Sequence, residues 1–133
     1  MLTSASGGNA EIRAAFRRGI VLLNAGSFFD AHEALEDAWR ESARGSALRR
    51  HLQGMVQVAV ALHHQSRDNF TGARSVLERA LKNLDGAEDS FPDLDLDRLR
   101  SELADWQKYL AGAGQRGGRP AAPRIARRDS ARK

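Results

Sequence analysis

The chain has 133 residues, which is long enough for one domain with a single hydrophobic core. It contains no cysteine, and this excludes disulfides, thiolate metal sites and a cysteine nucleophile. The formal charge of +4 is unevenly distributed, because residues 111–133 hold seven Arg and Lys side chains and one acidic side chain. The basic character therefore belongs to a C-terminal segment and does not indicate a nucleic-acid-binding domain.

The first ten residues lack the basic-then-apolar pattern of a secretory signal. No apolar run approaches the roughly 20 residues that are needed to span a bilayer. We therefore expect a cytoplasmic protein that does not associate with membranes.

Five helices are predicted from the spacing of apolar residues, and no segment alternates as a β-strand does. They are expected over the ranges 9–24, 28–44, 47–66, 70–84 and 95–110. The third is apolar nearly all round, which is typical of a central helix in a bundle. Residues 1–8 and 111–133 have few large apolar side chains and are predicted to be disordered, which leaves one helical domain over residues 9–110.

Capping residues mark several of the predicted helix ends. Ser27 and Asp30 have the spacing of a capping box at the start of the second helix. Asn69 takes the corresponding place before the fourth helix. Gly26 and Gly86 stand where helices are expected to stop.

An internal repeat with an offset of 42 residues relates the second helix to the fourth. The repeated apolar positions pair Phe28, Ala31, Leu35 and Ala38 with Phe70, Ala73, Leu77 and Ala80. The spacing is similar to that of tetratricopeptide hairpins, although those repeat every 34 residues. We therefore predict an all-α fold, a compact bundle of two repeated antiparallel helical hairpins closed by a fifth, C-terminal helix.

The candidate site lies on the second and third helices. One shoulder of the second helix carries three polar side chains, His32, Glu33 and Glu36. The third helix carries a polar stripe on an otherwise apolar surface, formed by Gln53, Gln57 and His64. If these two helices pack side by side, imidazole, carboxylate and amide groups would share a partly buried pocket.

Three interpretations of this pocket stay open. In the first, His32 and Glu36 bind a divalent metal with His64 or His63 as a third ligand, and Glu33 acts as the general base. Residues 32–36 resemble the zincin helix motif, but a glutamate replaces its second histidine. In the second, the same groups bind a small polar ligand or perform acid–base chemistry without a metal. In the third, which we favour, they form a buried hydrogen-bond network between the helices.

Three separated blocks carry a resemblance to a known family. They read Asn24-Ala25-Gly26-Ser27-Phe28-Phe29-Asp30-Ala31-His32-Glu33 with Leu35-Glu36 and Trp39-Arg40, then Leu52-Gln53-Gly54-Met55-Val56-Gln57, then Asp68-Asn69-Phe70-Thr71-Gly72-Ala73. Over about residues 16–84 the chain resembles a bacterial and archaeal family catalogued as domain of unknown function 309. Ser27 and Asp30 depart from its pattern, which has glutamate at both positions. The resemblance implies a compact all-helical fold and a cytoplasmic protein, and it implies no reaction.

From the sequence we expect a non-catalytic binding or interaction protein, whose His/Glu/Gln pocket takes a small polar ligand or a protein partner. Whether it is an enzyme is left open. One alternative is a metal-dependent hydrolase that uses His32, Glu33 and Glu36, with a divalent metal as a cofactor that we do not favour. Another is a nucleic-acid-associated protein that makes weak contacts through residues 111–133.

Overall fold

The computed structural model describes residues 2–112 and 118–128, with side chains described from residue 9 onward. This part of the chain forms the helices α1 (Leu2–Asn24), α2 (Phe28–Glu41), α3 (Ala47–Ser66), α4 (Phe70–Asn83) and α5 (Leu96–Ala111). A short 3-10 helix, Ala87–Asp89, precedes α5. The predicted all-α fold is confirmed. None of the described helices is long and apolar enough to cross a membrane.

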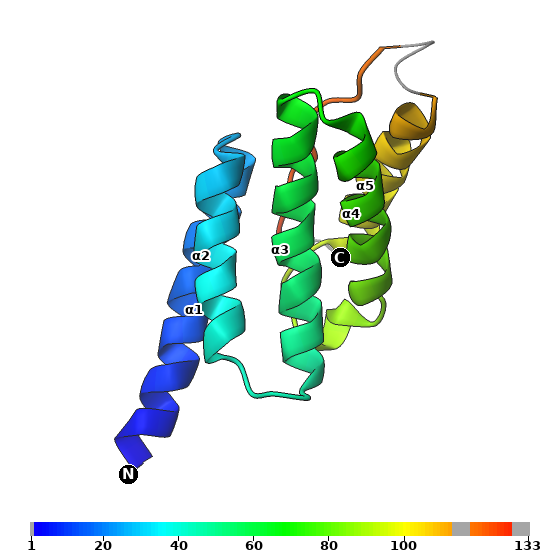
Figure 1. Cartoon of the computed structure of the whole chain (residues 1–133). Coiled ribbons are helices and arrows are strands. Elements are labelled where there is room, and N and C mark those ends of the chain that lie inside the picture. Colours follow the sequence, from blue (N-terminus) through cyan, green and yellow to red (C-terminus); the bar gives the residue numbers. More distant parts are fainter. Residues whose placement is uncertain (1, 113–117, 129–133) are drawn as a thin grey trace.

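The helices pack in chain order, α1 against α2, α2 against α3, α3 against α4 and α4 against α5 (Figure 1). The two hairpins, α1–α2 and α3–α4, therefore stand next to each other as predicted. Helix α3 lies between α2 and α4, and Leu52, Met55 and Val58 on it are fully buried. Its nearly continuous apolar surface follows from having neighbours on opposite sides.

Small residues explain why the helices of each hairpin approach so closely. The repeated alanines, Ala31, Ala38, Ala73 and Ala80, are all fully buried. A Cβ atom added to Gly19 of α1 would lie 2.5 Å from Cγ of Leu35 on α2. Leucine and alanine at these repeated positions thus form the contact surface of both hairpins.

Most helix boundaries agree with the predicted ones. Helix α2 ends at Glu41, three residues before the predicted end, and α1 already includes residues 2–8, which were predicted to be disordered. Asn69 caps α4 as predicted, because its Oδ1 accepts a hydrogen bond from N of Gly72 at 3.0 Å. Ser27 occupies the N-cap position of α2, but its side chain makes no capping hydrogen bond, so the predicted capping box does not form.

Residues 118–128, which we call the strap, differ most from the prediction. They do not extend away as a disordered tail but run behind α3 in the view of Figure 1. Pro123 and Ile125 are buried, and Arg127 forms an isolated antiparallel β-bridge with Leu94. Two buried anchors and paired backbone groups hold a segment whose composition is poor in apolar residues. The rest of the predicted tail, residues 113–117 and 129–133, lies outside the described residues.

Candidate functional site

The predicted polar shoulder of α2 lies at the surface. Nε2 of His32 is 3.7 Å from Oε1 of Glu36, and their side chains are 25% and 39% exposed. The same Glu36 oxygen is 3.6 Å from Nη1 of Arg40. Glu33 is exposed. Solvated contacts of this length contribute little to stability, so the shoulder is not a buried network.

The predicted polar stripe of α3 faces α4 and not α2. Oε1 of Gln57 accepts a hydrogen bond from Nδ2 of Asn83 at 2.8 Å. Gln53, one turn earlier on α3, is exposed. Nδ1 of His64 lies 3.3 Å from Nδ2 of Asn69. The side chain that meets α2 is the neighbouring His63. A step of one residue turns a helix by about 100°, and this rotation separates the stripe from the shoulder.

His63 reaches α2 through an aromatic contact. Its ring centroid is 5.6 Å from that of Phe29, which in turn lies 5.8 Å from the ring of His32. Of the six predicted site residues, only His32 and Glu36 meet. Within the described residues, no three His, Asp or Glu side chains lie close enough to hold one metal ion. A role for these residues in binding or catalysis stays a prediction from the sequence.

The structure brings together a histidine and a serine that the sequence analysis did not connect. Nδ1 of buried His51 lies 2.6 Å from Oγ of Ser90, and its Nε2 lies 3.3 Å from Nη2 of Arg50. The ring therefore has a polar neighbour at each nitrogen, and the backbone of Asp85 is a further hydrogen-bond partner. Burial, together with the Arg50 charge, lowers the pKa of His51. The pair therefore ties α3 to the loop before α5.

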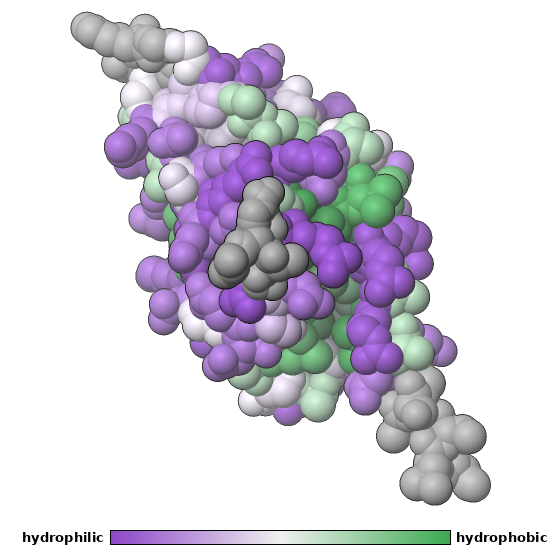
Figure 2. All heavy atoms as spheres, turned by 180° about the vertical axis from the view of Figure 1, so that it is seen from behind, coloured by the Kyte–Doolittle hydropathy of each residue, from purple (hydrophilic) through white to green (hydrophobic). Residues whose placement is uncertain are grey.

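A groove of about 740 Å³ lies between α1, the start of α3, the loop at residues 90–94 and the strap. We call it the α1 groove. Its apolar lining comes from all four elements and includes Ile12, Phe16, Ile20, Leu52, Phe91 and Ile125. Three arginines also line it, Arg13, Arg17 and Arg127. Figure 2 shows the molecule from behind, where hydrophobic surface appears between strongly hydrophilic side chains.

Two aromatic rings form one wall of the α1 groove. Phe16 of α1 stacks on Phe91, with ring centroids 4.6 Å apart and planes inclined by 9°. Phe91 also meets the ring of His51 edge-on at 6.4 Å. Through these contacts the loop before α5 is fixed against α1 and α3 together, so the groove has a preformed wall.

The strap is held by backbone hydrogen bonds on both of its edges. Nδ2 of Asn24 donates to O of Ile125 at 3.0 Å, and N of Ile125 donates to Oδ1 of Asn24 at 2.8 Å. On the other edge, N of Asp95 donates to O of Ala126 at 2.8 Å, and N of Arg128 donates to O of Asp93 at 2.6 Å. The single side chain of Asn24 thus pairs with the strap as a neighbouring strand would.

Helix α5 adds two further contacts to the strap. Nε1 of Trp106 donates to O of Ala121 at 2.9 Å, and Oε1 of Glu102 accepts from N of Arg124 at 2.9 Å. Because the partners of the strap are backbone groups and side chains that lie 15 to 101 positions away in the chain, no local pattern in the sequence points to them.

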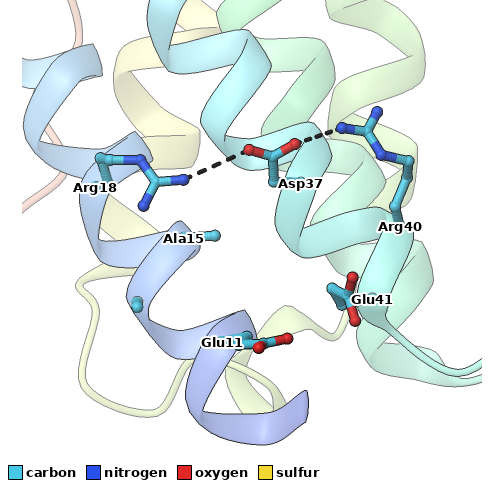
Figure 3. Close-up of a pocket in the computed structure, with 7 residues that line it drawn as sticks. Glu11, Ala15, Arg18, Asp37, Arg40 and Glu41 are labelled. Carbon is cyan, nitrogen blue, oxygen red and sulfur yellow. Dashed lines mark hydrogen bonds and ion pairs between the residues drawn. The ribbon is translucent and has the colours of Figure 1, made fainter. Parts of the chain in front are cut away.

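A second hollow, of about 380 Å³, lies between α1 and α2 and is shown in Figure 3. Asp37 lies there between Arg18 and Arg40 and pairs with both, with its Oδ2 3.5 Å from Nη2 of Arg18. Glu11 and Glu41 also line it. Arg18, Asp37 and Arg40 pair with one another at the surface, so this hollow is a weaker candidate for a ligand site than the α1 groove.

Comparison with known proteins gives a family but no reaction. Residues 16–76 match the family described as Domain of unknown function (DUF309). The chain is 34% identical over 73 residues to the uncharacterized protein YpuF of Bacillus subtilis (strain 168). This alignment covers 55% of this chain and 41% of YpuF. It is 29% identical over 80 residues to an uncharacterized protein of Aquifex aeolicus (strain VF5), covering 60% of this chain and 24% of that protein.

The chain thus spans less than half the length of these curated relatives. Asn24, α2 and most of the hairpin α3–α4 lie inside the matched residues, and α5 and the strap lie outside them. The resemblance inferred from the three sequence blocks is confirmed, with a match that ends eight residues before the expected residue 84. Residues 16–76 of this chain are thus similar to the DUF309 family.

Proposed function

We propose that this domain is a non-catalytic binding module that holds an extended, acidic segment of a partner protein in the α1 groove. The observation that carries the proposal is the combination of an apolar floor with an arginine rim. A cytoplasmic location, predicted from the sequence, is part of the same proposal.

The floor of the groove suits the side chains of an extended peptide. Ile12 and Leu52 are buried, while Phe16 and Ile20 are only partly buried and pack against the core. A partner side chain placed on them would bury apolar surface, which is the main source of affinity in such grooves. The stacked rings of Phe16 and Phe91 form a wall beside this floor, so the groove is already formed before a ligand binds.

The rim of the groove selects for negative charge. Arg13 and Arg17 are four residues apart and therefore lie on one face of α1. Neither they nor Arg127 take part in the ion pairs found among the described residues. Asp93 is the one acidic residue in the lining. The excess of positive charge attracts carboxylates and speeds the encounter with an acidic partner.

A protein segment fits this surface better than a nucleic acid does. Proteins that bind single strands offer exposed aromatic rings for bases to stack on. Among the described residues, the exposed large hydrophobic side chains are Val21 and Phe29, and Phe29 belongs to α2 and not to the groove. The rings of Phe16 and Phe91 are stacked on each other. The nucleic-acid contact predicted for residues 111–133 is tested alongside this proposal, with an RNA probe.

The test measures fluorescence anisotropy of three labelled probes with the full chain. They are a short peptide with one isoleucine flanked by glutamates, its counterpart with lysines in place of glutamates, and a single-stranded RNA of about 12 nucleotides. We expect the acidic peptide to bind most tightly and its affinity to fall with added salt. The double variant Arg13→Glu/Arg17→Glu should weaken this binding by about tenfold or more, because two favourable charges become repulsive.

The matched control is Arg74→Glu/Arg79→Glu, which changes the charge equally on exposed positions of α4. An equal loss of affinity in both double variants would show that only the net charge matters. Tighter binding of the lysine peptide, or of the RNA, would also overturn the proposal.

A further inference from the structure

We infer that the strap, residues 118–128, is a self-ligand that occupies one end of the α1 groove and that an extended segment of the partner displaces it from Asn24. The identity of the displacing partner rests on the proposed function. The recognition of the strap itself rests on separate contacts.

The strap is recognised through its backbone. The Asn24 carboxamide pairs with both N and O of Ile125, and residues 93–95 pair with Ala126 and Arg128 from the opposite edge. Contacts of this kind depend on an extended backbone and hardly on the side chains that it carries. Any extended segment with a suitable anchor can therefore make the same hydrogen bonds.

Of the two buried anchors of the strap, Ile125 is the one that lines the groove. Ile125 is 4% exposed, whereas the preceding Arg124 is exposed and the following Ala126 is only partly buried. Alternating burial along an extended chain creates a pocket for a single residue. We therefore expect the partner segment to place a branched aliphatic side chain where Ile125 now lies.

The charges of the strap make it a poor match for the groove. Arg127 lines the same groove as Arg13 and Arg17, so the self-ligand adds a third positive charge to a positive rim. A segment with carboxylates in that place would replace repulsion by attraction. The strap occupies the site because it is tethered, which gives it an effective concentration in about the millimolar range, and not because its charges are complementary.

The family match covers Asn24, on one edge of the strap, but not the strap itself. Asn24 and the groove residues of α3 lie within the matched residues 16–76, and the strap lies outside them. Asn24 therefore belongs to the part of the chain that matches the family, whereas residues 93–95 and the strap lie outside it.

Strap release can be measured by hydrogen exchange in the full-length chain, without any added ligand. The variant is Ile125→Asp, and the control is Ala122→Asp, which adds the same charge at an exposed position of the strap. The amide of Asp95 and the indole N–H of Trp106 report on release, since both donate to the strap. We expect their exchange to accelerate by about tenfold or more in Ile125→Asp and in Asn24→Ala, but not in the control.

The amides of Val58 and Leu62 in α3 should keep their protection in every variant. If they lose protection together with Asp95, the strap is an integral part of the folding unit and the inference fails. It also fails if the exchange of Asp95 and Trp106 is unchanged in both release variants.

The second measurement supplies the strap in trans. A labelled peptide with the sequence of residues 118–128 should bind saturably to Ile125→Asp and about tenfold or more weakly to the parent and to Ala122→Asp, whose site is occupied. Adding Asn24→Ala to Ile125→Asp should abolish binding. No saturable binding to Ile125→Asp, or equal binding to the parent, would overturn the inference. Neither measurement uses the acidic probe, so a failure here is distinct from a failure of the proposed function.

Discussion

His51 is a buried titratable side chain whose ring joins Arg50 and Ser90. Its lowered pKa makes the stability of the fold depend on pH. Well above pH 6.5 the ring is neutral in both the folded and the unfolded chain. As the pH falls through that value the unfolded chain takes up the proton first, so the free energy of unfolding decreases.

We predict that the urea midpoint of the parent falls between about pH 7.5 and about pH 5.5, and that it falls less in His51→Gln. Glutamine removes the titrating group while keeping polar atoms near Ser90. His63→Gln, a partly exposed position on the same helix, is the control. Equal pH dependence in the parent and in His51→Gln would show that the ring is not responsible.

His32 tests the remaining catalytic hypothesis. Because its contact with Glu36 is long and partly exposed, His32→Ala should cost less than about 1 kcal/mol of stability. We further predict that calorimetric titration of zinc, manganese or iron(II) shows no micromolar binding that depends on this residue. Micromolar binding that vanishes in both His32→Ala and Glu33→Gln, with unchanged unfolding midpoints, would favour the metal-dependent hydrolase.

The sequence could not reveal the roles of Asn24 and His51. Both interact with residues that are distant in the chain, Ile125 and Ser90, and local spacing carries no information about such pairs. The polar shoulder of α2 was visible in the sequence because it depends only on helical periodicity. Whether the stripe of α3 would meet it depended on a rotation of one residue, which periodicity does not fix.

The helices themselves follow closely from their sequences. The starts of α2, α3 and α4 at Phe28, Ala47 and Phe70 agree with the predicted ones, because apolar spacing and the preceding turn residues both indicate them. The 3-10 helix before α5 carries no such periodicity and was not predicted. The ordered strap was not predicted either. Its two buried anchors, Pro123 and Ile125, hardly change the amino-acid composition of the segment, and backbone pairing does not depend on composition.

The hairpin α1–α2 depends on the absence of a side chain at Gly19. A Cβ atom there would lie 2.5 Å from Cγ and 2.6 Å from Cδ2 of Leu35, and 3.4 Å from the Leu35 backbone nitrogen. Leu35 is fully buried and cannot move away without disturbing the core. The interface of this hairpin therefore has room for glycine at position 19 but not for alanine.

We predict that Gly19→Ala lowers the free energy of unfolding by about 1–3 kcal/mol, because the helices must separate or Leu35 must leave its rotamer. Denaturant unfolding measures the change. Gly118→Ala is the control, since nothing lies within 4 Å of the added Cβ there. Stabilisation by Gly19→Ala, as expected for an unstrained helix position, would contradict this account of the hairpin.

The described chain combines two helical hairpins, which are similar to the DUF309 family over residues 16–76, with a C-terminal segment that reaches back to the first hairpin. The strap contacts α1 through Asn24 and α5 through Glu102 and Trp106, so it connects the beginning of the domain with its end. The acidic and basic parts of the sequence are thereby brought together. The α1 groove is left with a positive rim and an apolar floor, and this surface is the centre of the functional proposal.

The most direct test of this proposal is an NMR titration of the isotope-labelled full chain with the acidic peptide. The account predicts that amide shifts concentrate along the groove, at Arg13, Phe16, Arg17, Phe91 and Ile125, with the Asp95 amide moving as the strap is displaced. Shifts centred instead on Phe29, His32 and His63, or none at saturating peptide, would contradict it.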